Sequence, residues 1–165
     1  MSNPPSWLPE PLNYDDFGGK WDKFLTSVYG IFERDFKYSR PIFKEHRITY
    51  NSTLVAGKEE AFWHITSSSD TVTGNREPNM RRCERIAWIK SIIEHANDEY
   101  VKMWENKRGS SIHILLWLEE LDYMVILRER RNRAVLLSAI YIDQNHKRRK
   151  LRKEWEQWTK SQKPP

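Results

Sequence analysis

Residues 112–143 read IHILLWLEELDYMVILRERRNRAVLLSAIYID, and this stretch decides the fold. It holds three runs rich in Leu, Ile, Val and aromatic residues, joined by short polar connections around Leu121-Asp122 and Arg131-Asn132. Apolar, β-favouring runs bounded by such connections are typical of strands, and short connections place consecutive strands antiparallel. The stretch therefore predicts an antiparallel meander.

The remaining elements follow from the spacing of apolar residues along the chain. Apolar residues three and four positions apart predict helices, whereas β-branched and aromatic runs predict strands. The predicted helices are residues 20–37, 79–97 and 145–160, and the predicted strands outside the opening stretch are residues 42–50, 60–67 and 100–105, with a turn at 106–111. This order predicts the α+β class, with N-terminal helices packed on a four- to five-stranded antiparallel sheet and a C-terminal basic helix.

Length and composition indicate a single folded domain. The chain has 165 residues, and 13% of them are aromatic, which is more than disordered chains contain. We expect an extended arm at 1–19, one α+β domain at 20–160 and a tail at 161–165. The N-terminus lacks the pattern of a signal peptide, and no apolar run is long enough to span a bilayer. With the single cysteine, Cys83, these features predict a cytoplasmic protein without membrane contact.

The charge of the chain is distributed unevenly. Residues 1–77 hold 9 Lys and Arg against 11 Asp and Glu, whereas residues 78–165 hold 19 against 12. Six Lys and Arg and one His fall within residues 146–153 alone. A basic second half indicates an anionic partner, although a surface rich in solvated lysines would have the same composition.

Several kinds of chemistry lack their usual sequence signals. There is no Gly-rich phosphate loop, CxxC pair, HExxH motif or serine-hydrolase elbow, and the five His have no ligand spacing. We therefore expect no metal and no cofactor. His64, in the predicted strand FWHITS, is the first candidate for acid–base chemistry because the pKa of histidine lies near neutrality. The alternative is a histidine that is hydrogen-bonded inside a half-buried strand.

Other candidate residues also have plain structural explanations. Tyr141 is accounted for by cross-strand packing, and Arg128 with Arg130 by solvated charge at a sheet edge. Trp155 and Trp158 lie three residues apart on the predicted C-terminal helix, where packing is favoured over base stacking.

Residues 57–155 resemble phage and polymorphic-toxin members of the barnase–EndoU–colicin–RelE superfamily, which are small α+β ribonucleases. The resemblance rests on the segments GKEEAFWHITSSS, RRCERIAWIKSII, LDYMVILRER, LLSAIYID and HKRRKLRKEWE. The family's final strand carries a Thr-Ala-Tyr run, where this chain has Ser138-Ala139-Ile140-Tyr141 with one extra residue. Either Tyr141 is not the equivalent residue, or a β-bulge changes the direction of its side chain.

The resemblance implies two sets of site residues. The catalytic set is His64, Arg82, Arg85, Arg128, Ser138 and Tyr141. The RNA-binding set is Thr66, Ser67, Arg130, His146, Lys147, Arg148, Arg149, Lys150, Arg152 and Lys153.

Cleavage of RNA without a metal suits these residue types. A base takes the proton of the 2′-OH, an acid protonates the leaving 5′-oxygen, and cations stabilise the charge on the phosphate. Three functions follow as hypotheses. The first is a metal-independent endoribonuclease that leaves a 2′,3′-cyclic phosphate, for instance a toxin of a toxin–antitoxin or phage-conflict system. The second is a non-catalytic nucleic-acid-binding protein, and the third is a protein whose basic half binds an acidic antitoxin or inhibitor. The first is our prediction, with RNA as the main partner.

Overall fold

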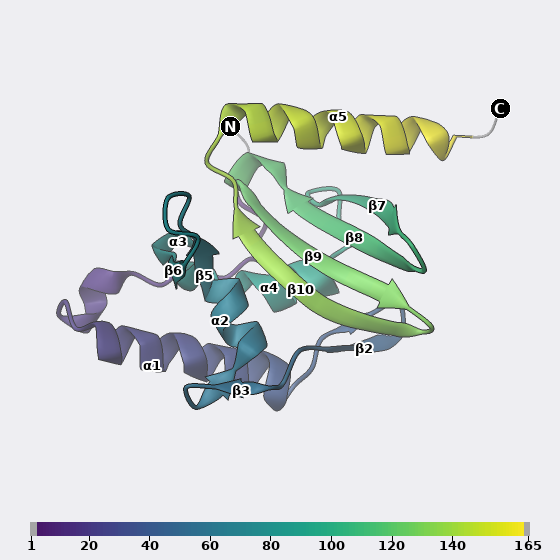
Figure 1. The fold of residues 1–165 in the computed structure, drawn as a ribbon. Helices are drawn as coiled ribbons and strands as arrows, with labels where there is room; N and C mark the ends of the chain where they lie inside the picture. The colour runs from purple at the N-terminus through teal and green to yellow at the C-terminus, as the bar shows by residue number, and fades with distance from the viewer. Residues whose placement is uncertain (1–2, 164–165) are drawn as a thin grey trace.

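The computed structural model describes residues 3–163, which form an α+β fold around a curled sheet (Figure 1). In this part of the chain the main sheet has six strands, in the order β1-β2-β10-β9-β8-β7. They are β1 (Ile42–Phe43), β2 (His46–Thr49), β7 (Lys102–Arg108), β8 (Ser111–Leu118), β9 (Tyr123–Arg130) and β10 (Arg133–Tyr141). Neighbours are antiparallel except β2 and β10, which are parallel. The α+β class is confirmed. The expected four- to five-stranded antiparallel sheet is wrong, because the sheet has six strands and is mixed.

The three strands predicted from residues 112–143 are present as β8, β9 and β10. The two connections between them are tight turns that contain residues with positive φ. Asp122 has φ 58°, and Arg131 and Asn132 have φ 50° and 64°. Two consecutive left-handed residues make the hairpin turn whose twist matches that of antiparallel strands. The connection between β7 and β8 turns at Gly109, which has φ 61°. Residues 106–108 of the turn predicted at 106–111 belong to β7 instead.

The two faces of the sheet bury different sets of side chains. One face packs against the main core, to which β8 contributes the buried side chains of Ile114, Leu116 and Leu118. The other face carries Leu115 and Trp117, which belong to a second, smaller core. Both faces of this part of β8 are therefore covered, and its sequence reads as a continuous apolar run rather than an alternation.

A β-bulge interrupts the alternation in β10. Leu136 is opposite Leu127 of β9, but the next pair is Ser138 with Ile126, so Leu137 is the extra residue. After the bulge, Ala139 still faces the main core, while Ser138 faces the opposite side. A bulge was expected in this strand as one explanation of the extra residue, and it lies just before Ser138.

The main core lies between the sheet and the helices of the first hundred residues. Phe24, Val28 and Phe32 of α1 (Trp21–Phe32) are fully buried in it, which confirms the helix predicted from their spacing. A π-helical turn, Glu33–Lys37, continues α1. The helix predicted at 79–97 is present as two helices, α3 (Met80–Glu84) and α4 (Trp88–Glu94), of which α4 passes behind the sheet in Figure 1.

The predicted strand at 60–67 is wrong, because these residues form the helix α2 (Glu60–Thr66). Ala61, Phe62 and Ile65 are buried at helical spacing and pack into the main core. Two-stranded hairpins flank α2 in the chain: β3 (Leu54–Val55) with β4 (Lys58–Glu59), and β5 (Ser67–Ser69) with β6 (Arg76–Pro78). Residues 60–66 therefore form a helix because it buries these side chains in the main core, although their composition favours a strand.

The C-terminal helix predicted at 145–160 is confirmed as α5 (Asn145–Ser161). In Figure 1 it lies across the top of the sheet. Leu151 is buried in the second core, and Trp155 and Trp158 pack against that core. The two tryptophans are thus helix packing, as expected from their spacing. Of the described residues, no helix is long and apolar enough to cross a membrane.

The N-terminal arm is attached to α3 and α4. Trp7 stacks on His95 with ring centroids 4.4 Å apart, and its indole donates a hydrogen bond to Asp98. The Trp88 indole donates to the carbonyl of Pro9 at 2.8 Å. The arm is not extended throughout, since Tyr14–Phe17 form a 3-10 turn. The expected tail at 161–165 reaches past the described residues.

The parallel pairing of β2 with β10 depends on Ile48, which is opposite Ala134 and fully buried. We expect Ile48→Ala to lower the free energy of unfolding by about 2–5 kcal/mol, because it opens a cavity in the main core. Urea denaturation measures this loss. Arg47→Ala, an exposed neighbour on the same strand, is the control and should change stability by less than about 0.5 kcal/mol. Equal effects of the two changes would contradict this packing.

Candidate active site

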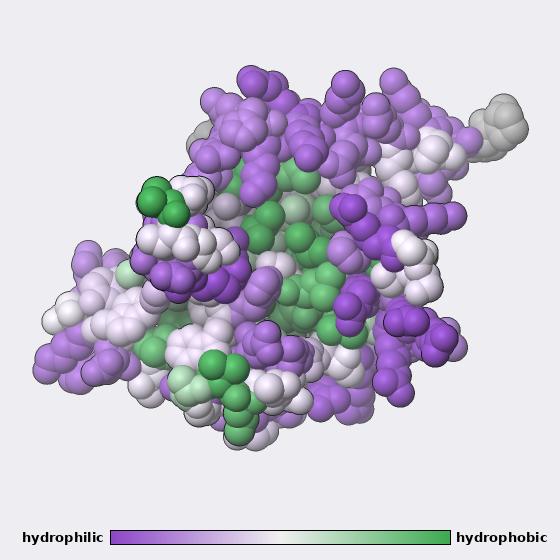
Figure 2. Space-filling view, viewed as in Figure 1, coloured by the Kyte–Doolittle hydropathy of each residue, from purple (hydrophilic) through white to green (hydrophobic). Residues whose placement is uncertain are grey.

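A groove lies between α2 and the open part of the sheet face that carries Ser138. It has a volume of about 460 Å³. We call it the histidine groove because His64 from α2 and His113 from β8 both line it. Its other lining residues are Asn51, Glu60, Ala61, Ile126, Arg128, Val135, Leu136, Leu137 and Ser138. Figure 2 shows an apolar region, in green, between α5 at the top and the helices below, with polar side chains around it.

His64 is half-buried on α2, beside the residues that pack into the main core. Burial lowers the pKa of its imidazole below the ordinary value of 6.5, and the positive charges of Arg76 and Arg82 lower it further. Glu60 acts in the opposite direction. The ring is therefore neutral at pH 7 and able to accept a proton.

His113 is the second histidine of the groove, and it was not among the predicted site residues. The strand register places it opposite Arg128 of β9 on one side and opposite Asn106 of β7 on the other. Burial lowers its pKa, as do the charges of Arg108 and Arg128. The sequence contains one indication of this residue. If the two predicted strands on either side of the connection at Leu121-Asp122 are aligned as a hairpin, His113 lies opposite Arg128.

Arg128 and Ser138 are the predicted catalytic residues that lie with His64 in the groove. Arg128 is exposed, and no ion pair or hydrogen bond of its side chain occurs among the described residues. Ser138 reaches this face only because of the bulge at Leu137, without which Ser138 would share the core face with Leu136. The groove thus has a free guanidinium, a hydroxyl and two imidazoles.

Arg82 and Arg85 were predicted to bind phosphate, but both are engaged within the protein. The Arg82 guanidinium donates to the carbonyls of Ser67 (2.5 Å) and His64 (3.4 Å), just at the C-terminal end of α2. Cations are favourable at this end of a helix. Arg85 forms an ion pair with Glu84 at 3.0 Å and stacks over the ring of Trp88. Neither residue lines the histidine groove.

Tyr141, Thr66 and Ser67 are also outside the groove. Tyr141 lies on the face of β10 opposite to Ser138, with the Arg85 guanidinium 5.1 Å from its ring centre. Thr66 and Ser67 are buried, and their hydroxyls donate to the carbonyls of Phe62 and Trp63 within α2. The bulge precedes both residues, and Ser138 and Tyr141 are three positions apart in the regular part of β10, so they face opposite sides and do not share one site.

The predicted RNA-binding residues of α5 divide into two sets. Arg148 forms a two-point ion pair with Asp122, with N–O distances of 2.6 and 3.0 Å, and Arg152 pairs with Glu119 at 2.7 Å. These two arginines hold α5 on the sheet. The rest of the set is exposed and has no ion pair within residues 3–163: His146, Lys147, Arg149, Lys150 and Lys153. Arg130 is likewise exposed, at the end of β9.

The residue types that line the groove are suited to acid–base chemistry on an anion. Two imidazoles on separate elements are able to exchange protons with a substrate from different directions, and Arg128 supplies positive charge for a phosphate. Throughout residues 3–163, no three His, Cys, Asp or Glu side chains come together as a metal site. Cys83 is buried, and burial raises the pKa of its thiol to about 12, so it is not a nucleophile near neutral pH.

Different arginines lower the pKa of His64 and of His113, so removing one arginine should change the pKa of one histidine only. We expect Arg76→Gln to raise the pKa of His64 towards 6.5, because a nearby positive charge is removed, and to leave His113 unchanged. Arg108→Gln should raise the pKa of His113 and leave His64 unchanged. NMR titration of the imidazole protons measures both values. A shift of both histidines by either change would contradict the separate placement of the two arginines.

Comparison of the chain with protein-family models, with curated proteins and with solved structures gave no match.

Proposed function

We propose that this protein is a metal-independent endoribonuclease that cleaves RNA to a 2′,3′-cyclic phosphate, and that it acts as a toxin of a toxin–antitoxin or phage-conflict system. The observation that carries the enzymatic part is the joint position of His64, His113 and Arg128 in one groove. The basic second half of the chain and the motifs noted in the sequence also favour RNA. The biological role rests on the sequence resemblance alone.

The proposed reaction is a transfer within the RNA. The 2′-oxygen loses its proton to one imidazole and forms a bond to the adjacent phosphorus, while the bond from phosphorus to the 5′-oxygen breaks. The second imidazole, in its protonated form, donates a proton to this leaving oxygen. Arg128 holds the phosphate and stabilises the charge that develops on it, and the Ser138 hydroxyl donates a hydrogen bond to a phosphate oxygen. No metal ion takes part in any of these steps.

The first test is incubation of the purified protein with RNA in EDTA, with identification of the ends of the products. We expect cleavage with 2′,3′-cyclic phosphate ends. Loss of one member of an acid–base pair should slow the reaction by about 10²–10⁴-fold in His64→Ala and in His113→Ala. Lys23→Ala, an exposed change on α1, is the control and should leave the rate unchanged. Full activity of either histidine variant would remove that histidine from the mechanism.

The second test is the pH dependence of kcat/KM. The reaction needs one imidazole neutral and the other protonated, so the profile should be bell-shaped. Both histidines have pKa values lowered below 6.5, so the maximum should lie on the acid side of pH 6.5. Activity should fall as the pH rises through neutrality, because the acid loses its proton. A maximum at alkaline pH would argue against this pair.

A non-catalytic nucleic-acid-binding protein is the second candidate. The observation that favours it is the internal engagement of Arg82 and Arg85, which leaves Arg128 as the predicted catalytic cation in the groove. This candidate is preferred if the protein binds RNA or DNA and leaves it intact over the whole pH range. Binding of an acidic antitoxin or inhibitor is compatible with both candidates, since such a protein would use the same cations.

A further inference from the structure

Three arginines from the strands β7, β9 and β10 lie at the far end of the open sheet face. Arg108 of β7 is opposite Ser111 of β8. Arg130 of β9 follows Glu129, which is opposite Ile112 of β8, and Arg133 of β10 is directly opposite Arg130. Because side chains two residues apart share a face, these arginines lie on the same side of the sheet as His113 and Arg128. They are thus one step beyond the histidine groove, measured along the strands.

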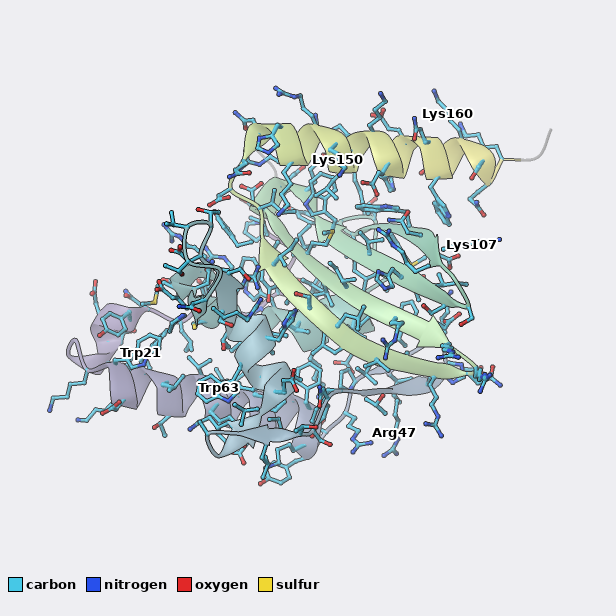
Figure 3. All side chains as sticks on the ribbon, viewed as in Figure 1. Trp21, Arg47, Trp63, Lys107, Lys150 and Lys160 are labelled. Atoms are coloured by element: carbon cyan, nitrogen blue, oxygen red, sulfur yellow. The ribbon has the colours of Figure 1, made fainter. Side chains whose placement is uncertain are left out.

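A hollow of about 510 Å³ lies beside two of these arginines, Arg130 and Arg133. Its lining residues are Thr49, Arg128, Arg130, Arg131, Arg133 and Val135. Arg128 and Val135 also line the histidine groove, so the two depressions are adjacent. None of the described residues that line the hollow is acidic. Figure 3 labels Lys107, which belongs to the adjacent β7–β8 hairpin and lies well away from Lys150 on α5.

The placement of these arginines is unfavourable for the isolated fold. Like charges directly opposite each other on paired strands destabilise a sheet, and Arg130 and Arg133 form such a pair. Neither has an ion pair within the described chain, and both are exposed. Arg148 and Arg152 of α5, in contrast, each have an acidic partner. An external anion would compensate the charge at the hairpin, whereas part of the charge of α5 is already compensated.

We infer that the hollow binds backbone phosphates of the RNA that flank the cleaved bond, so that the RNA strand leaves the groove over the β9–β10 hairpin and not along α5. This inference rests on the proposed function. Arg130 is four positions after Ile126 of the groove, a length of about 13 Å along the strand. That length is enough for a few nucleotides of an extended strand. The inferred substrate is RNA that is single-stranded on that side of the cleaved bond.

The first experiment measures binding without cleavage. The probe is a labelled 2′-O-methyl oligoribonucleotide of about 12 nucleotides, which is single-stranded and lacks the attacking hydroxyl. Loss of two phosphate contacts in Arg130→Thr/Arg133→Thr should reduce the slope of log K against log salt by about 1.4 and weaken binding roughly tenfold. Lys20→Ser/Lys23→Ser removes two exposed charges from the α1 end and should change neither quantity. Thermal unfolding of the hairpin variant should show unchanged or higher stability, because the like-charge pair is gone.

The second experiment compares substrates of different length. A dinucleotide has only the phosphate that is cleaved, so wild type and Arg130→Thr/Arg133→Thr should cleave it equally well. A longer single strand should be cleaved more slowly by the variant at low substrate concentration, with kcat preserved and KM raised. This difference separates a contact to flanking phosphates from damage to the groove.

Three results would overturn the inference. The first is that Arg130→Thr/Arg133→Thr, the hairpin variant, binds and cleaves RNA as the wild type does, while Lys147→Ala/Lys150→Ala on α5 weakens binding. The proposed function would then stand. Another is an equal loss of dinucleotide cleavage in the hairpin variant, which would place these arginines in the reaction itself. A wild-type protein that binds an acidic polypeptide but neither binds nor cleaves RNA would overturn the proposed function as well.

Discussion

The one-residue bulge at Leu137 is the constraint on which the arrangement of both sheet faces depends. Before it, Leu136 points into the main core; after it, Ala139 does so again, although three positions separate them. In an unbroken strand an odd separation would send one of the two to the opposite face. The bulge therefore allows β10 to contribute small and branched side chains to the core on one side and Ser138 to the groove on the other.

Local periodicity predicted most of the fold, and non-local pairing produced the errors. The runs within residues 112–143 and the helices α1 and α5 each carry their own pattern, so neighbouring residues alone identify them. The parallel pairing of β2 with β10 joins residues more than 80 positions apart, and no local pattern indicates it. The segment at 60–67 has β-favouring residues, but Ala61, Phe62 and Ile65 are buried together only in a helix. Residue type decides little in so short a segment when packing favours the other state.

The candidate site was predicted in part, and the arginines show why. Residue type marks an arginine as a cation but does not show whether an acid or a carbonyl of the same chain already binds it. Arg82, Arg148 and Arg152 all have such partners, and the partners of Arg148 and Arg152 lie on distant segments. Arg128 has none among the described residues, and it lies in the groove. His113 was missed because it stands in an apolar run and gains its neighbours only through the strand register.

The features on which the proposed function depends oppose the stability of the folded chain. Both histidines hold their pKa values below 6.5, so at lower pH the unfolded chain binds more protons than the native one. The native state is therefore penalised as the pH falls below 6.5, in the range where one of the two imidazoles carries a proton. The paired arginines of the β9–β10 hairpin add a like-charge cost at any pH. A bound phosphate reduces both penalties, since it favours the protonated imidazole and screens the guanidinium groups from each other. Under the proposed function, the same groups therefore couple the stability of this sheet edge to the binding of a polyanion.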